Sequence, residues 1–345
     1  MQSKRLSWID SGRGFCGIGV VLYHLSDWLA TISPNTVLLQ DIAIALAPLR
    51  MPLFFLISGL LAQSIHLASP EKWRVRILGL LALYLFWSAL FFSRVPLIAT
   101  IRNAQPPSIE QFLMAIVIPS IFWFILCLPV FYIVIIVYKR TFGTRYMPLL
   151  IFATVLAISS DWIDERTQHL VAPAFGQAQV GPMSFNFIWF VLGTYFGDQY
   201  KKLVLDATPI RLIGTLLLAG LLTALTWNTS YATLRLIMAA AFLVLFANIL
   251  GLLDPRTRMM RTLDFVGHYT LPLYIFHIIL VAIVGGAIRN NEQAVEVLRS
   301  NALLANSAIL FGTIGCTVVS VWLGKQLSNS RFAWLIVPRD WARSR

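Results

Sequence analysis

The stretch DSGRGFCGIGVVLYHL, residues 10–25, places ionisable side chains inside an apolar segment. Arg13 and His24 are eleven positions apart, which in an α-helix is about three turns plus about 20°, so both lie on one face. At about 1.5 Å per residue they are about 16 Å apart along the helix axis. Asp10 precedes Arg13 by three residues and Asp27 follows His24 by three, so both join that face. The segment predicts a helix with one ionisable face.

The composition of the whole chain is typical of a membrane protein. Of the 345 residues, 58% are hydrophobic and 12% are charged, whereas charged residues make up about a quarter of an ordinary soluble domain. The net charge of +12 does not indicate a nucleic-acid partner, because the basic residues of membrane proteins gather in cytoplasmic loops that face anionic lipid. The three cysteines lie in apolar runs without metal-ligand spacing, so we expect neither a disulfide nor a metal site.

Apolar stretches long enough to cross a bilayer recur along the chain. A spanning helix needs about 20 apolar residues, and in lipid every span must satisfy its backbone hydrogen bonds as a helix. No loop is long enough for a separate soluble domain, so residues 1–345 are expected to form a single all-α, polytopic integral-membrane domain. About ten transmembrane helices are predicted, at 13–32, 46–66, 77–98, 116–138, 147–163, 184–199, 208–227, 232–252, 265–288 and 303–324.

The basic residues divide into two groups. Most of the 27 lysines and arginines fall on alternate loops, and the opposite side carries acidic residues such as Asp161, Asp164 and Glu165. By the positive-inside rule both termini are cytoplasmic and the number of spans is even. Arg50 and Arg235 instead lie within or at the edge of apolar runs, where each either snorkels to an interface or lines a polar cavity.

The histidine in the first apolar segment has two interpretations. An ionisable residue at membrane depth is a functional hypothesis by default, and the nearby Asp27 carboxylate would stabilise the protonated imidazole of a general base. Alternatively, Arg13 is an interface anchor and His24 makes a packing hydrogen bond. Four ionisable residues on one face favour a functional site.

A second unusual stretch is RMPLFFLISGLL, residues 50–61. A proline, a serine and a glycine interrupt an apolar helix, which is tolerated where neighbouring helices or a cavity satisfy the backbone. Ser58 either orients a carbonyl or acceptor group, or Ser58 and Gly59 are small residues that allow two helices to approach closely. We favour the close approach.

The N-terminal pattern resembles the opening of the acyltransferase family 3 membrane proteins. Their Arg-x10-His pattern is matched by Arg13 and His24, and MPLFFLISG follows in the expected place. Further similar pieces are YLFW at 84–87, FWFI at 122–125 and GHYTLPLYIFH at 267–277. The residues that carry the opening of the pattern are Arg5, Asp10, Arg13, Gly14, Val20 and His24.

The resemblance implies an enzyme that transfers an acyl group, usually acetyl, from cytoplasmic acyl-CoA to a hydroxyl of a cell-surface polysaccharide or lipid-linked glycan. It implies a multi-pass protein of the cell inner membrane with acetyl-CoA as donor substrate and no permanently bound cofactor. Membrane lipids and glycan-assembly proteins are the implied partners. The alternative is a transporter or flippase of glycan-lipid or small organic ions, because broken helices and intramembrane charges occur there too.

Basic residues before the third expected span are candidates for binding the acyl-CoA donor. Arg13, Lys72, Arg74 and Arg76 could hold the phosphates of coenzyme A by charge-assisted hydrogen bonds. The family commonly has an Arg-x-x-Arg pair here, whereas this chain has Arg76 followed by Gly79 at the second position. The alternative role of the cluster is positive-inside anchoring.

The late stretch GHYTLPLYIFH ends in the Tyr-x-x-His of the resembled family. Tyr274 and His277 are three residues apart and so share a helix face. They are expected either to join a polar network around the site or to have a structural role. His66, His169 and His268 lie near loop ends and are assigned no role.

Overall fold

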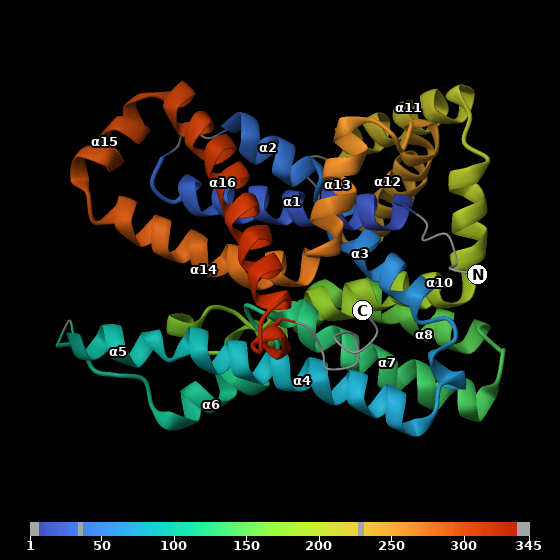
Figure 1. Cartoon of the computed structure of the whole chain (residues 1–345), viewed down its shortest axis with the longest axis horizontal. Helices are drawn as coiled ribbons and strands as arrows, with labels where there is room; N and C mark the ends of the chain where they lie inside the picture. The colour runs from blue at the N-terminus through green and yellow to red at the C-terminus, as the bar shows by residue number, and fades with distance from the viewer. Residues whose placement is uncertain (1–6, 34–36, 102, 227–230, 337–345) are drawn as a thin grey trace. The chain divides into compact units, whose positions relative to one another are not determined.

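The computed structural model describes residues 7–33, 37–101, 103–226 and 231–336 (Figure 1). Every regular element in these ranges is a helix, which confirms the all-α prediction. Arg5 of the N-terminal pattern and both chain ends lie outside the described residues, so the expected cytoplasmic location of the termini stays a prediction.

The chain forms two compact units that interleave along the sequence. Unit 1 comprises residues 1–54, 202–227 and 238–332, and unit 2 comprises 55–201, 228–237 and 333–345. Helix α3 (Ala47–Leu61) contributes to both. Neither unit is continuous in sequence. The expectation that residues 1–345 form a single integral-membrane domain stays a prediction.

Unit 1 is built around α1 (Ser7–Ala30), which packs against α2, α13, α14 and α16 (Figure 1). Val21, Leu25 and Leu29 recur every four residues along α1 and are buried together with Leu273 and Ile309. Side-chain caps fix where several of these helices begin. The other helices of this unit are α2 (Val37–Ala45), α11 (Pro209–Thr226), most of α12 (Ala232–Leu252), α13 (Arg258–His268), α14 (Thr270–Arg289), α15 (Glu292–Ser300) and α16 (Ala302–Ser328).

Unit 2 has an aromatic core. Phe55, fully buried on α3, has its ring centroid 5.0 Å from that of Phe124 and 5.4 Å from that of Phe131. Phe131 in turn packs on Phe190 at 5.4 Å. The helices of this unit are α4 (Pro70–Phe92), α5 (Arg94–Ile101), α6 (Ile109–Val117), α7 (Trp123–Phe142), α8 (Met147–Ile158), α9 (Ser160–Thr167) and most of α10 (Val180–Leu205), with short 3-10 turns η1 (Ile65–Leu67), η2 (Gln168–Leu170), η3 (Pro173–Phe175) and η4 (Ala333–Leu335).

The close helix approach expected at Gly59 is present in unit 2. A Cβ on Gly59 would overlap the Phe190 carbonyl of α10, and a Cβ on Gly193 would overlap the Leu56 carbonyl of α3. The crossing therefore requires glycine on both helices. Ser58 is partly buried next to it.

The ten predicted spans are not confirmed. Six described helical stretches are long and apolar enough to cross a membrane, or eight if each of two bent helix pairs forms one span. Helix α1 is not among them, because its ionisable residues lower its hydropathy. The expected spans 184–199 and 208–227 fall in one pair bent by 117°. The six are Leu38–Leu67, Pro70–Ile101, Trp123–Phe142, Ala232–Leu252, Thr270–Arg289 and Ala302–Ser328.

Candidate active site

The ionisable face of the first segment lies on one continuous helix. We call its four residues, Asp10, Arg13, His24 and Asp27, the stripe. All four are in α1, which is unbroken from Ser7 to Ala30. Arg13 donates from Nη1 to Oδ1 of Asp10 at 3.5 Å, and the Asp10 carboxylate is buried. The Asp10 and Arg13 end of the stripe is therefore an ion pair within unit 1.

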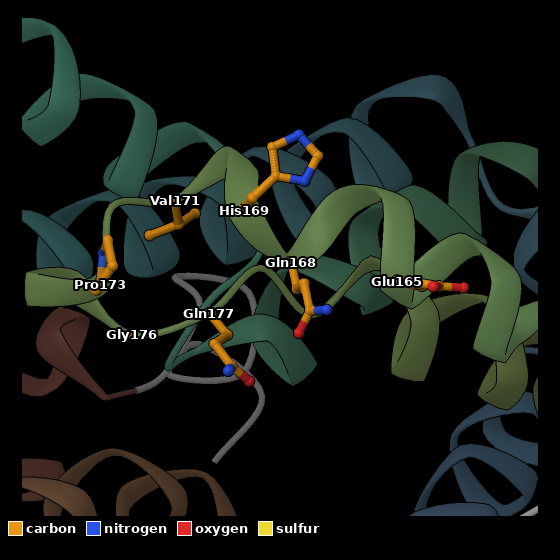
Figure 2. Close-up of a pocket in the computed structure, with 7 residues that line it drawn as sticks. All are labelled: Glu165, Gln168, His169, Val171, Pro173, Gly176 and Gln177. Carbon is orange, nitrogen blue, oxygen red and sulfur yellow. The ribbon is translucent and has the colours of Figure 1, made fainter.

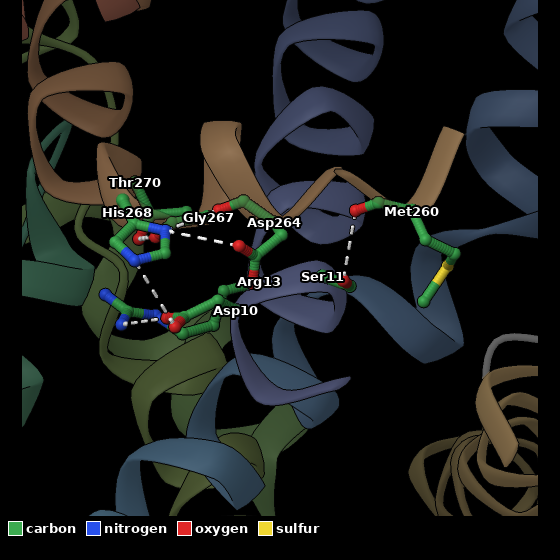
Figure 3. A network of polar contacts seen from close by, with 8 residues as sticks. All are labelled: Asp10, Ser11, Arg13, Met260, Asp264, Gly267, His268 and Thr270. Atoms are coloured by element: carbon green, nitrogen blue, oxygen red, sulfur yellow. Dashed lines mark hydrogen bonds and ion pairs between the residues drawn. The ribbon is translucent and has the colours of Figure 1, made fainter. Parts of the chain in front are cut away.

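His268, to which the sequence analysis assigned no role, lies next to Asp10 at this end of the stripe (Figure 3). His268 Nδ1 lies 2.7 Å from the backbone oxygen of Asp264, so Nδ1 carries the hydrogen and donates it. This bond leaves Nε2 to face Asp10, with 3.8 Å between Nε2 and Oδ2. The spacing of Asp264 and His268, four residues apart on one helix, was the available signal.

The same cluster has the residue types of a metal site. Asp10, Asp264 and His268 each offer one ligand atom, and these atoms lie within 4.8 Å of one another. The Arg13 guanidinium is paired with the Asp10 carboxylate, however, and its positive charge opposes a cation there. We interpret the cluster as a polar network between α1 and α13, in which the Arg13 guanidinium balances the charge of the Asp10 carboxylate.

A close crossing of α1 and α13 positions this network. A Cβ on Gly14 would overlap the Leu263 carbonyl, and a Cβ on Gly267 would overlap the Asp10 carbonyl. Since Gly267 directly precedes His268, the same approach that needs a glycine brings the imidazole to the Asp10 carboxylate.

The other end of the stripe meets a second histidine. The ring centroids of His24 on α1 and His277 on α14 are 5.3 Å apart, and Tyr274 lies 5.8 Å from His277. His277 is buried and its Nδ1 donates to the Leu273 carbonyl at 2.9 Å. Its Nε2 is buried without a hydrogen-bond partner among the described residues. Unit 1 thus pairs the two histidines that the sequence singled out.

Asp27 does not complete this pair in the structure. Its side chain is exposed, and within the described ranges no hydrogen bond or ion pair joins it to His24. Its part in catalysis stays a prediction.

The basic cluster expected to bind coenzyme A lies on α4 of unit 2. Lys72 and Arg74 are exposed, and Arg74 lies over the Trp73 ring at 5.5 Å. Arg76 donates from Nη2 to the Tyr132 hydroxyl at 2.9 Å. Arg13 is in the other unit, so a shared phosphate site stays a prediction.

An open pocket lies elsewhere in unit 2 (Figure 2). It has a volume of about 440 Å³ and contains none of the predicted site residues. In Figure 2, the side chains of Gln168 and Gln177 extend to the same side of the chain and the His169 ring points the other way. Its lining residues are Glu165, Gln168, His169, Val171, Pro173, Gly176 and Gln177.

Comparison with known proteins identifies the kind of molecule to which this site belongs. A family model described as an acyltransferase domain matches residues 6–325. The chain belongs to this acyltransferase family. The match covers nearly the whole chain, confirms the resemblance drawn from the sequence, and supports a membrane acyltransferase at family level.

A relative of this acyltransferase is similar over most of its length. The inner membrane protein YcfT of Escherichia coli (strain K12) is 27% identical over 311 residues, which cover 82% of this chain and 81% of the relative. No solved structure matches. Together with the apolar helices, this likeness supports a multi-pass membrane protein.

Proposed function

We propose that the protein transfers an acetyl group from cytoplasmic acetyl-CoA to a hydroxyl of a cell-surface polysaccharide or lipid-linked glycan, in the inner membrane. The observation that carries the proposal is the pair of His24 and His277, whose ring centroids are 5.3 Å apart in unit 1. The chain that holds this pair belongs to an acyltransferase family. His24 is partly buried, and none of the described hydrogen bonds occupies its ring nitrogens. It is therefore free to contact a substrate.

In the proposed reaction, His24 removes the proton from the acceptor hydroxyl as general base. The acceptor oxygen attacks the thioester carbonyl carbon, a C–O bond forms, the C–S bond breaks, and the coenzyme A thiolate leaves with the proton returned by His24. His277 supports this step, because its Nδ1–H is held by the Leu273 carbonyl and its Nε2 retains a lone pair. That lone pair can accept a hydrogen bond from the protonated His24 ring.

The phosphates of the donor are assigned to arginine and lysine side chains. Arg13 is paired with Asp10 on one side and is partly exposed on the other. Lys72, Arg74 and Arg76, all on α4, are likewise proposed to bind phosphate groups of coenzyme A by charge-assisted hydrogen bonds. Glycan-assembly proteins would supply the acceptor.

Transport of glycan-lipid remains the second candidate function. The two bent helix pairs favour it, because discontinuous helices line the sites of many transporters. Membranes that contain the full chain, incubated with acetyl-CoA labelled in the acetyl group, separate the two functions. An acyltransferase releases free coenzyme A and labels a membrane or surface glycan, whereas a transporter leaves the thioester intact.

Replacing Arg13 with glutamine should raise the KM for acetyl-CoA by about 10- to 100-fold, the usual effect of losing a hydrogen bond to a charged group. The matched control is Arg211→Gln, an exposed arginine on α11 that should leave KM unchanged. Initial rates over a range of acetyl-CoA concentrations, normalised to protein level in the membrane, give both values. An unchanged KM in the Arg13 variant would remove this arginine from the donor site.

A further inference from the structure

Arg50 is a buried charge without a counter-ion. It lies on α3 in unit 1 and has 6% of its surface exposed, so it does not snorkel to an interface. Within the described ranges no carboxylate forms an ion pair with it. Its Nη1 donates to the Gly19 carbonyl at 3.2 Å, and its Nε is buried without a partner.

Arg235, the other arginine of an apolar run, has its charge balanced by a carboxylate. Arg235 on α12 forms an ion pair with Asp161, and both side chains are about half exposed. A buried guanidinium has five N–H donors and is costly to leave unpaired. Arg50 has neither a carboxylate nor exposure to offset that cost, so its remaining donors are available to a ligand.

Arg50 reaches the turn of α1 that carries His24. Its guanidinium lies over the Tyr23 ring, 4.3 Å from the centroid, and the Tyr23 and His24 ring centroids are 5.3 Å apart. Gly19 leaves room for this approach, because a Cβ there would lie 3.1 Å from Arg50 Cδ, which is closer than ordinary van der Waals contact. Arg50 from α3 and His277 from α14 therefore both approach this part of α1.

We propose that Arg50 is a catalytic residue that binds the thioester carbonyl oxygen of the donor. This assignment rests on the proposed function. When the acceptor oxygen forms its bond to the carbonyl carbon, the π-electron pair moves onto the carbonyl oxygen, which becomes an oxyanion that accepts hydrogen bonds from the guanidinium. When the C–S bond breaks, the pair returns to re-form the carbonyl and the coenzyme A thiolate leaves. A positive charge in a low-dielectric site stabilises the oxyanion more than the neutral thioester.

The test compares Arg50→Met and Arg50→Lys with Arg235→Met in membranes of expressing cells, using labelled acetyl-CoA as the probe. Removing one oxyanion donor typically costs about 10²- to 10³-fold in kcat, so we expect that loss for Arg50→Met with KM for acetyl-CoA changed by less than about threefold. Arg50→Lys keeps the charge but lacks the planar fork, and should retain an intermediate kcat. Arg235→Met should turn over at the wild-type rate.

Protein level and thermal unfolding in detergent distinguish catalysis from a structural clamp. A kcat loss in a variant that accumulates and unfolds like the wild type supports the assignment. If Arg50→Met fails to accumulate, Arg50→Lys carries the test, and a wild-type kcat in that variant overturns the assignment. A wild type that leaves acetyl-CoA intact overturns the proposed function itself, whereas an active wild type with equally active Arg50 variants overturns the role of Arg50 alone.

Discussion

Replacing His24 with glutamine is expected to lower acyl transfer by a factor of about 10² to 10⁴, which is the usual contribution of a positioned general base. Glutamine is polar and of similar size, but its amide cannot take a proton from a hydroxyl at neutral pH. Because none of the described hydrogen bonds involves the His24 side chain, the variant should still fold and insert. Release of coenzyme A and label in the glycan fraction measure the loss.

The matched control is His169→Gln in the open pocket of unit 2. His169 is exposed and lies outside the proposed catalytic pair, so its replacement should leave turnover within about twofold of the wild type. If His24→Gln transfers acetyl as fast as this control, the general-base mechanism is wrong.

The same variant decides between two routes open to His24. As a base it never carries the acetyl group, whereas as a nucleophile it forms a transient acyl-imidazole. Rapid quenching of the wild type during turnover, followed by separation of protein from free label, detects the acyl-enzyme. Label on the wild type and not on His24→Gln indicates the covalent route, and unlabelled protein during turnover indicates direct transfer.

The parts of the site that follow from local periodicity could be predicted from the sequence. The spacing of Arg13 and His24 depends only on helix geometry, and α1 is continuous across both residues. The crossing at Gly59 also followed from a small residue in an apolar helix, and Gly193 is its counterpart. These predictions required no knowledge of which helices pack together.

The parts that depend on helix packing could not be predicted. His268 contacts Asp10 across a sequence separation of more than two hundred residues, and only the approach of α13 to α1 brings them together. Arg50 was recognised as a charge at depth, but its burial over Tyr23 depends on how α3 meets α1. The count of ten spans is not confirmed for a different reason, because helices such as α1 combine the length of a span with ionisable residues that lower their hydropathy.

Replacing Gly267 with alanine should destabilise the protein and disconnect the Asp10 network. The new Cβ would overlap the Asp10 carbonyl, so α13 must move away from α1. Overpacking of this kind typically costs about 1–3 kcal/mol of unfolding free energy, more than the gain of up to about 1 kcal/mol from glycine to alanine in a helix. Thermal unfolding of the full chain in detergent measures the change.

The control for this prediction is Gly315→Ala on α16, where a Cβ would meet no atom within 4 Å. That variant gains helix propensity without a clash, so its unfolding midpoint should be unchanged or higher. The displaced α13 would also carry His268 away from Asp10, so Gly267→Ala should lose acyl transfer even at temperatures where it remains folded. Full activity in a folded Gly267→Ala variant would show that the site tolerates separation of the two helices, and that the Asp10 network is dispensable for the reaction.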